Sequence, residues 1–204
     1  MVSVGLVLFV LTAFTITGFG LPNPPKDGYG VEELSWKVEV FPGQAHHVLN
    51  GTIQHVYNQV MEINPGFQLK PNSAVKKRQD ASRVSPLKKR QTLTNYYCDN
   101  FPPAQCGPIA DGINYLIGVS GQPVNGPGPG NCGQVSCSYD SAIWWCNDNP
   151  TTYTLASFID IAALAQDVVN DCAYGDCLVS FAPTVAGQQF TDQDWNVIVR
   201  NGIC

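Results

Sequence analysis

The chain has 204 residues, a formal net charge of −5 and eight cysteines. A negative charge opposes binding to the phosphate backbone of nucleic acids, so we expect no nucleic-acid partner. The length allows a real hydrophobic core, which disulfides would reinforce rather than replace.

Residues 1–20 (MVSVGLVLFVLTAFTITGFG) are apolar and uncharged, and small glycines precede a plausible cleavage point. The run is shorter than a bilayer span and leads into a proline- and glycine-rich stretch that cannot continue a helix. It predicts a secretory signal peptide, with an uncleaved anchor helix as the alternative. No other segment is apolar enough to cross a membrane, so we expect a secreted, extracellular protein without stable membrane insertion.

The next segment contains two predicted elements. Residues 35–43 (SWKVEVFPG) alternate apolar and polar side chains, which favours a β-strand. Residues 52–66 carry apolar side chains at helical spacing and end at an Asn-Pro pair. Asn50 begins the one Asn-X-Thr/Ser sequon of the chain, which predicts an N-glycosylated glycoprotein.

The tetrapeptide KKRQ occurs twice, at residues 76–79 and 88–91. Clustered dibasic sites in an exported chain present cationic bonds that suit the acidic cleft of a processing protease. We predict cleavage by such a protease and a pro-segment spanning residues 21–90. A solvated basic linker or a nucleic-acid-binding tail is the alternative for the dibasic stretch, and a subdomain that is never removed is the alternative for the residues before it. The processing residues are Lys77, Arg78, Lys89 and Arg90.

The distribution of charged residues and of cysteines changes at Arg90, the end of the second dibasic site. Residues 1–90 contain ten basic and six acidic side chains, a net charge of +4, whereas residues 91–204 contain one and ten, a net charge of −9. The cysteines lack the close spacings and histidines of a zinc site. They predict a disulfide framework whose pairing stays open among roughly a hundred possibilities. All lie after the second dibasic site: Cys98, Cys106, Cys132, Cys137, Cys146, Cys172, Cys177 and Cys204.

Residues 91–204 form one predicted mature domain. Apolar spacing predicts helices over 106–118 and 157–172, the second opened by a capping box of Ser157 and Asp160. The residue patterns predict strands at 93–98, 177–181 and 195–200, and a hairpin over 134–149 that turns at Asp140-Ser141. This order indicates an α+β fold of the split β-α-β type, a disulfide-rich sandwich of an antiparallel sheet with both helices on one face.

The chemistry available to residues 91–204 is narrow, because this stretch contains no histidine and no lysine. Triads based on histidine and Schiff-base lysines are therefore excluded, which leaves aspartate acid–base catalysis as in glycoside hydrolysis. We predict no catalytic residue, no cofactor and no metal. Hard oxygens suited to calcium occur without EF-hand spacing, at Asn147, Asp148, Asn149, Asp192 and Asp194.

Four stretches, CSYDSAIWWCNDN (137–149), IAALAQDVVNDC (161–172), GQQF (187–190) and WNVIVRNGIC (195–204), together resemble small cysteine-rich secreted proteins of filamentous, often plant-associated, fungi. The VEVFPG and LNGTI stretches of the pro-segment are similar to that family too. Many of its members are treated as candidate effectors, and the resemblance carries over no catalytic residue. The helix–hairpin–helix–strand layout is more distantly similar to fungal killer toxins.

These features predict a monomeric, effector- or toxin-like protein that binds an extracellular target on a host or competitor. The surface that we would test first is Trp144, Trp145 and Asp148, although aromatic residues on a hairpin also suit a core. An aspartate-dependent, glycan-directed hydrolase and a protein acting on its own cell wall or surface are the alternatives.

Overall fold

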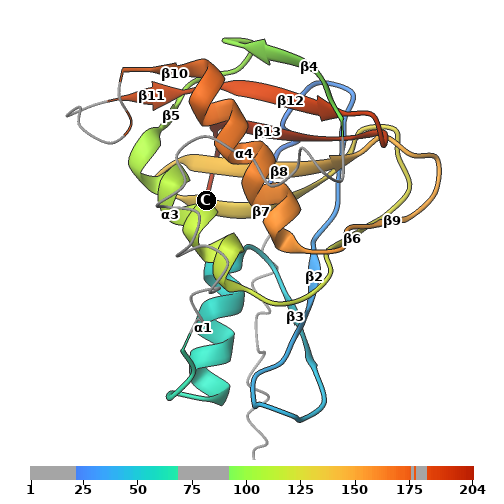
Figure 1. The fold of residues 1–204 in the computed structure, drawn as a ribbon, viewed down its shortest axis with the longest axis vertical. Helices are drawn as coiled ribbons and strands as arrows, with labels where there is room; N and C mark the ends of the chain where they lie inside the picture. The colour runs from blue at the N-terminus through green and yellow to red at the C-terminus, as the bar shows by residue number, and fades with distance from the viewer. Residues whose placement is uncertain (1–21, 69–91, 176, 178–182) are drawn as a thin grey trace, which may run out of the picture.

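The computed structural model describes residues 22–68, 92–175, 177 and 183–204; the predicted signal peptide and both dibasic sites lie outside them. Its elements, in chain order, are β1 (Gly30–Val31), β2 (Ser35–Val38), β3 (His47–Asn50), α1 (Ile53–Ile63), β4 (Leu93–Cys98), β5 (Ala104–Gln105), α3 (Cys106–Gly118), β6 (Val124–Asn125), β7 (Asn131–Ser138), β8 (Ser141–Asn147), β9 (Tyr153–Thr154), α4 (Phe158–Cys172), β10 (Ala173–Tyr174), β11 (Thr184–Val185), β12 (Gly187–Thr191) and β13 (Trp195–Asn201). Helices α3 and α4 lie across one face of the main sheet, while α1 and the β2–β3 hairpin lie at one end (Figure 1).

The main sheet has six strands in the order β1-β7-β8-β13-β12-β4. Strands β7, β8, β13, β12 and β4 pair antiparallel, which confirms the antiparallel pairing expected for this region, although β12 itself was not predicted. The sheet as a whole is nevertheless mixed, because β1 pairs parallel with β7. The correction comes from residues 22–68, which the sequence assigned to a separate segment and which add a strand to the domain that follows.

Several predicted elements are confirmed, two with the predicted ends and two with one end shifted by a residue. The strands at 93–98 and 195–200 and the helices at 106–118 and 157–172 are β4, β13, α3 and α4. The hairpin turns one residue earlier than predicted, at Tyr139 and Asp140, both of which adopt a positive φ. Two positive φ values are typical of the tight turn that matches the right-handed twist of paired strands. The predicted strand at 177–181 lies almost entirely outside the described residues.

Helix α4 begins at a side-chain cap. The hydroxyl of Ser157 accepts a hydrogen bond from the backbone nitrogen of Ile159 at 3.1 Å, which satisfies one of the free donors at the start of the helix. The apolar stripe of the helix then faces the sheet, where Ile161, Leu164 and Val168 are buried. The cap and the stripe together explain why the sequence predicted this helix well.

Helix α3 approaches β7 closely at Gly112. A β-carbon at this position would lie 2.3 Å from the Ser136 hydroxyl and 3.0 Å from the Ser136 β-carbon. We expect Gly112→Ala to lower the free energy of unfolding by about 1–2 kcal/mol, because overpacking outweighs the gain of about 1 kcal/mol in helix propensity. Gly107→Ala is the control in urea denaturation, since a β-carbon there would meet nothing within 4 Å. Equal stability of the two variants would contradict this packing.

Four disulfides lock the region after residue 91, and they settle the pairing that the sequence left open: Cys98–Cys172, Cys106–Cys177, Cys132–Cys146 and Cys137–Cys204. All eight cysteines are therefore oxidised, as predicted. Such a framework fits an extracellular or otherwise oxidising compartment. Within the described part of the chain, no helix is long and apolar enough to cross a membrane.

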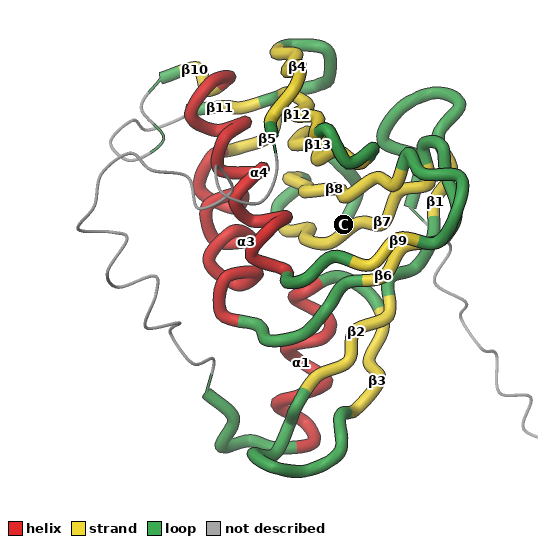
Figure 2. The backbone as a smooth tube through the Cα atoms, turned by 45° about the vertical axis from the view of Figure 1, so that its right-hand side comes forward, coloured by secondary structure: helices red, strands yellow, loops and turns green. Residues whose placement is uncertain are grey.

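The β2–β3 hairpin and α1 lie at one end of the fold (Figure 2), and their buried apolar side chains belong to the same hydrophobic cluster as those of α3 and α4. Helix α1 confirms the prediction at 52–66, and β2 confirms the start of the strand predicted at 35–43. Strand β3 was not predicted. The indole of Trp36 in β2 stacks on the ring of Phe158 in α4, with centroids 4.0 Å apart and planes 6° from parallel. Residues 22–68, the described part of the predicted pro-segment, are therefore packed into the same core as the domain that follows.

Candidate functional site

The two tryptophans proposed from the sequence as a surface are buried. Trp144 is 2% exposed and Trp145 is fully buried. Side chains alternate along β8, so Trp145 joins the core beneath the helices, whereas Trp144 joins a second cluster on the opposite face with Cys132, Cys146 and Ile198. Both faces of β8 are covered, and neither indole is presented to a partner in this structure.

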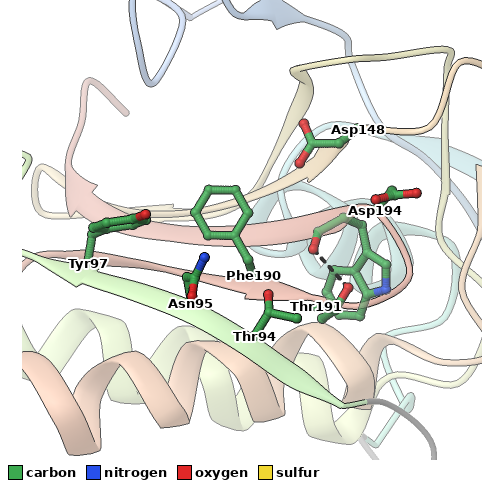
Figure 3. Close-up of a pocket in the computed structure, with 8 residues that line it drawn as sticks. Thr94, Asn95, Tyr97, Asp148, Phe190, Thr191 and Asp194 are labelled. Atoms are coloured by element: carbon green, nitrogen blue, oxygen red, sulfur yellow. Dashed lines mark hydrogen bonds between the residues drawn. The ribbon is translucent and has the colours of Figure 1, made fainter.

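A pocket of about 200 Å³ lies at the end of the sheet that holds Asp148, the third residue proposed from the sequence. Three elements meet there: β4, the end of β12, and the start of β13. Figure 3 shows Tyr97 and Phe190 beside each other and the two carboxylates toward the other end of the pocket. Its lining residues are Thr94, Asn95, Tyr97, Asp148, Phe190, Thr191, Asp194 and Trp195.

The aromatic wall of the pocket was not predicted. The rings of Tyr97 and Phe190 meet edge to face, with centroids 6.0 Å apart and planes at 88°. Tyr97 is 53% exposed, so its ring offers an apolar face to solvent and to a ligand. The pairing register of β4 with β12 shifts between Gln189 and Thr191, around Phe190. A bulge of this kind re-aims a side chain, and the sequence of β12 alone carries no sign of it.

The carboxylate of Asp148 is held by two hydrogen bonds. One oxygen accepts from the backbone nitrogen of Gly130 at 3.0 Å, and the other accepts from the side-chain amide of Asn196 at 2.7 Å. Asn196 is itself buried and accepts a hydrogen bond at 2.9 Å from the side-chain amide of Gln188. This chain of amides fixes the direction of the Asp148 side chain before any ligand arrives.

The second carboxylate, Asp194, sits in the turn between β12 and β13 with a φ of 53°. Its carbonyl oxygen accepts from the backbone nitrogen of Asp148 and from the side-chain amide of Asn149, each at 2.9 Å. These bonds tie the loop after β8 to the β12–β13 turn. Asp148 and Asp194 therefore lie on two loops that are joined by hydrogen bonds, and no lysine or arginine is among the lining residues.

Two of the residues considered for calcium, Asn147 and Asp192, make hydrogen bonds within the chain. Asn147 is fully buried and organises its loop, donating to the carbonyls of Gly126 at 2.7 Å and Thr151 at 2.8 Å. A carboxylate oxygen of Asp192 accepts from the backbone nitrogen of Thr92 at 3.2 Å. Across the described residues, no three histidine, cysteine or acidic side chains are grouped so that they could hold a metal ion.

Tyr153 lies beside the same turn and donates to the side-chain oxygen of Gln193 at 2.9 Å. Burial, followed by the negative charges of Asp160, Asp192 and Asp194, raises the pKa of its phenol above the ordinary 10.0. A raised folded-state pKa stabilises the fold fully below the unfolded value, and this contribution is lost as the pH rises through the folded value.

We therefore expect the unfolding free energy of the wild type to fall more steeply than that of Tyr153→Phe when the pH rises from about 8 to about 11. Urea denaturation at the two pH values measures this difference. Tyr139→Phe, at a residue 81% exposed on the hairpin turn, controls for loss of an exposed phenol. Identical slopes for wild type and Tyr153→Phe would contradict the expectation.

The remaining predicted site residues are placed as follows. Asn50 is exposed in β3, and its side-chain oxygen accepts from the Ser35 hydroxyl at 2.8 Å; its glycosylation stays a prediction. The processing residues Lys77, Arg78, Lys89 and Arg90 lie outside the described residues, and their cleavage stays a prediction. Comparison with protein-family models, with curated proteins and with solved structures finds no match to this chain.

Proposed function

We propose that this chain is a secreted, proteolytically matured, disulfide-stabilised protein of effector or toxin type, which binds its target outside the cell through the pocket between β4, β12 and β13. The observation that supports this proposal best is the preorganised pocket itself. It joins an exposed aromatic face to the Asp148 carboxylate, which two hydrogen bonds hold in place, and to a second carboxylate, Asp194. Rigid sites of this kind lose little conformational entropy when a ligand binds.

The composition of the pocket defines the kind of ligand. Carboxylate, amide and hydroxyl oxygens accept hydrogen bonds, and the Tyr97 ring packs against an apolar face. A ligand with several hydrogen-bond donors beside an apolar face, such as a sugar of a cell-surface glycan, fits this combination. The edge strand β4 that carries Tyr97 is anchored to α4 by the Cys98–Cys172 disulfide, which holds the aromatic wall in place.

The test compares wild type, Tyr97→Ala and Asp148→Asn in binding to a panel of host and fungal cell-wall glycans and in leaf infiltration scored for cell death. We expect each pocket variant to lower affinity by about tenfold or more, since truncation of a central aromatic or charged contact typically costs this much. Tyr139→Ala is the matched control, because Tyr139 lies on the turn at the other end of the β7–β8 hairpin. Wild-type binding and activity in both pocket variants would refute the pocket as the site.

An aspartate-dependent, glycan-directed hydrolase is the second candidate, because Asp148 and Asp194 line the same pocket and paired carboxylates perform such hydrolysis. Release of reducing sugar distinguishes a hydrolase from a protein that only binds the glycan. A hydrolase releases reducing sugar with multiple turnover, and Asp148→Asn or Asp194→Asn abolishes that release, whereas a binding protein yields none.

A further inference from the structure

Residues 22–68 do not form an independent unit beside the cysteine-rich domain. Their apolar side chains belong to the same continuous cluster as those of α3, α4 and the sheet. Interfaces between permanently associated chains resemble a domain core cut in half, and this contact has that character. The side chains that the segment contributes are Leu34, Trp36, Val38, Val40, Leu49, Ile53, Val56 and Val60.

We propose that cleavage at the dibasic sites does not release this segment, and that residues 22–68 stay on the cysteine-rich domain as a second chain held without a covalent bond. The proposal rests on the maturation described under Proposed function. No disulfide can link the two chains, because all eight cysteines follow residue 91 and pair with one another. Retention therefore depends on the packing and hydrogen bonds between them.

At the sheet edge, the segment supplies backbone and side-chain partners to β7. The backbone nitrogens of Gly30 and Glu32 donate to the carbonyls of Gly130 and Cys132 at 2.8 and 2.9 Å. The carboxylate of Glu32 then accepts from the backbone nitrogen of Gly126 at 2.9 Å and from the Asn131 amide at 2.8 Å. Loss of the segment would leave this edge of the sheet unpaired, which proteins generally avoid.

At the opposite end of β7, the side chain of Gln54 in α1 forms hydrogen bonds with residues of a β-bulge. Its side-chain nitrogen donates to the Ser136 hydroxyl at 2.8 Å, and its side-chain oxygen accepts from the backbone nitrogen of Cys137 at 3.1 Å. The register of β7 shifts here, between Gln134 and Ser136. The bulge therefore depends on an amide from the predicted pro-segment to complete its hydrogen bonds.

The segment also covers the face of the sheet opposite the helices. Tyr29 and Val31 pack against the cluster that contains Trp144 and Ile198. The guanidinium of Arg200 donates to the carbonyl of Pro25. Departure of the segment would uncover apolar side chains on both faces, which strongly favours the bound state.

Residues 22–68 pack so closely against β7 that a substitution in the cysteine-rich domain can test the contact. A β-carbon on Gly133 would lie 2.3 Å from the Leu34 side chain, and all three of the nearest atoms belong to Leu34. Gly133→Ala therefore disturbs the packing of residues 22–68 against β7. Gly107→Ala makes the same chemical change where nothing lies within 4 Å, and it is the matched control.

The experiment uses the purified secreted chain in its uncut form, cut in vitro with a lysine-arginine-specific processing protease. Intact mass confirms cleavage, and native mass spectrometry with size exclusion then reports association. We expect the wild-type and Gly107→Ala fragments to run as one 1:1 complex that separates in denaturant, and Gly133→Ala to release the segment at least about tenfold faster. Separate elution of the wild-type fragments without denaturant would overturn the proposal.

The two proposals fail in different ways. Secretion of a chain that is never cut in the producing cell would refute maturation, while the in vitro complex would still support the contact. If Gly133→Ala does not fold, Leu34→Ala offers the same test from the segment side. Retention has a direct consequence, because His46, His47 and His55 would then remain in the working protein although the sequence predicted their removal.

Discussion

Replacing Trp36 with alanine is expected to lower the free energy of unfolding of the full chain by about 3–5 kcal/mol. Trp36 is fully buried, its ring stacks on Phe158, and its indole nitrogen donates to the carbonyl of Gly51 at 2.7 Å. The change removes a large apolar side chain, leaves a cavity between the segment and α4, and orphans the Gly51 carbonyl. Urea denaturation followed by far-ultraviolet circular dichroism measures the loss.

Lys37→Ala is the control for that experiment. Lys37 is the next residue along β2 but points to solvent, so its replacement should change stability by no more than about 0.5 kcal/mol. A loss below about 1 kcal/mol in Trp36→Ala would mean that the segment is not docked as the structure shows. A loss in the expected range would support retention of residues 22–68, since the same contacts would oppose their release after cleavage.

Removing the Cys98–Cys172 disulfide by a double alanine substitution is expected to cost about 2–5 kcal/mol of unfolding free energy. The bond spans 74 residues, so its loss frees a long loop in the unfolded chain. It also links β4, which pairs with β12 at the edge of the sheet that the described residues form, to α4. Because Tyr97 precedes Cys98, we expect weaker ligand binding as well as lower stability.

The Cys137–Cys204 pair separates these two effects. Its bond spans 67 residues, a comparable loop, but it joins β7 to the C-terminus rather than β4 to α4. A double alanine substitution there should lower stability by a similar amount and leave pocket affinity near that of the wild type. If both double variants lose affinity equally, the disulfide at β4 has no special role in shaping the pocket.

The sequence by itself determined the elements whose side chains follow a strong period. Helix α4 has a capping serine and an apolar stripe, and β13 has alternating Trp195, Val197 and Val199, so each could be predicted from neighbouring residues. The oxidised state of the cysteines was predictable too, because their number and position are local facts. The antiparallel pairing of these strands followed from their order along the chain.

Other features were decided by tertiary structure alone. Strand β12 contains Gln188 and Gln189, which are buried although their side chains are polar, because they find hydrogen-bond partners on neighbouring strands. No apolar pattern marks such a strand. Strand β1 has two residues and exists through its pairing with β7. The burial of Trp144 likewise depends on what covers the second face of the sheet.

The candidate site shows the same division. Asp148 was selected from the sequence as part of the SAIWWCND stretch and as one of the oxygens suited to calcium. Tyr97 and Phe190 were not, because they lie 93 residues apart and meet only when β4 pairs with β12. Local periodicity determines which face of an element a side chain occupies. The pocket and the packing of residues 22–68 against the cysteine-rich domain depend instead on contacts between residues far apart in the chain, which a short stretch of sequence cannot predict.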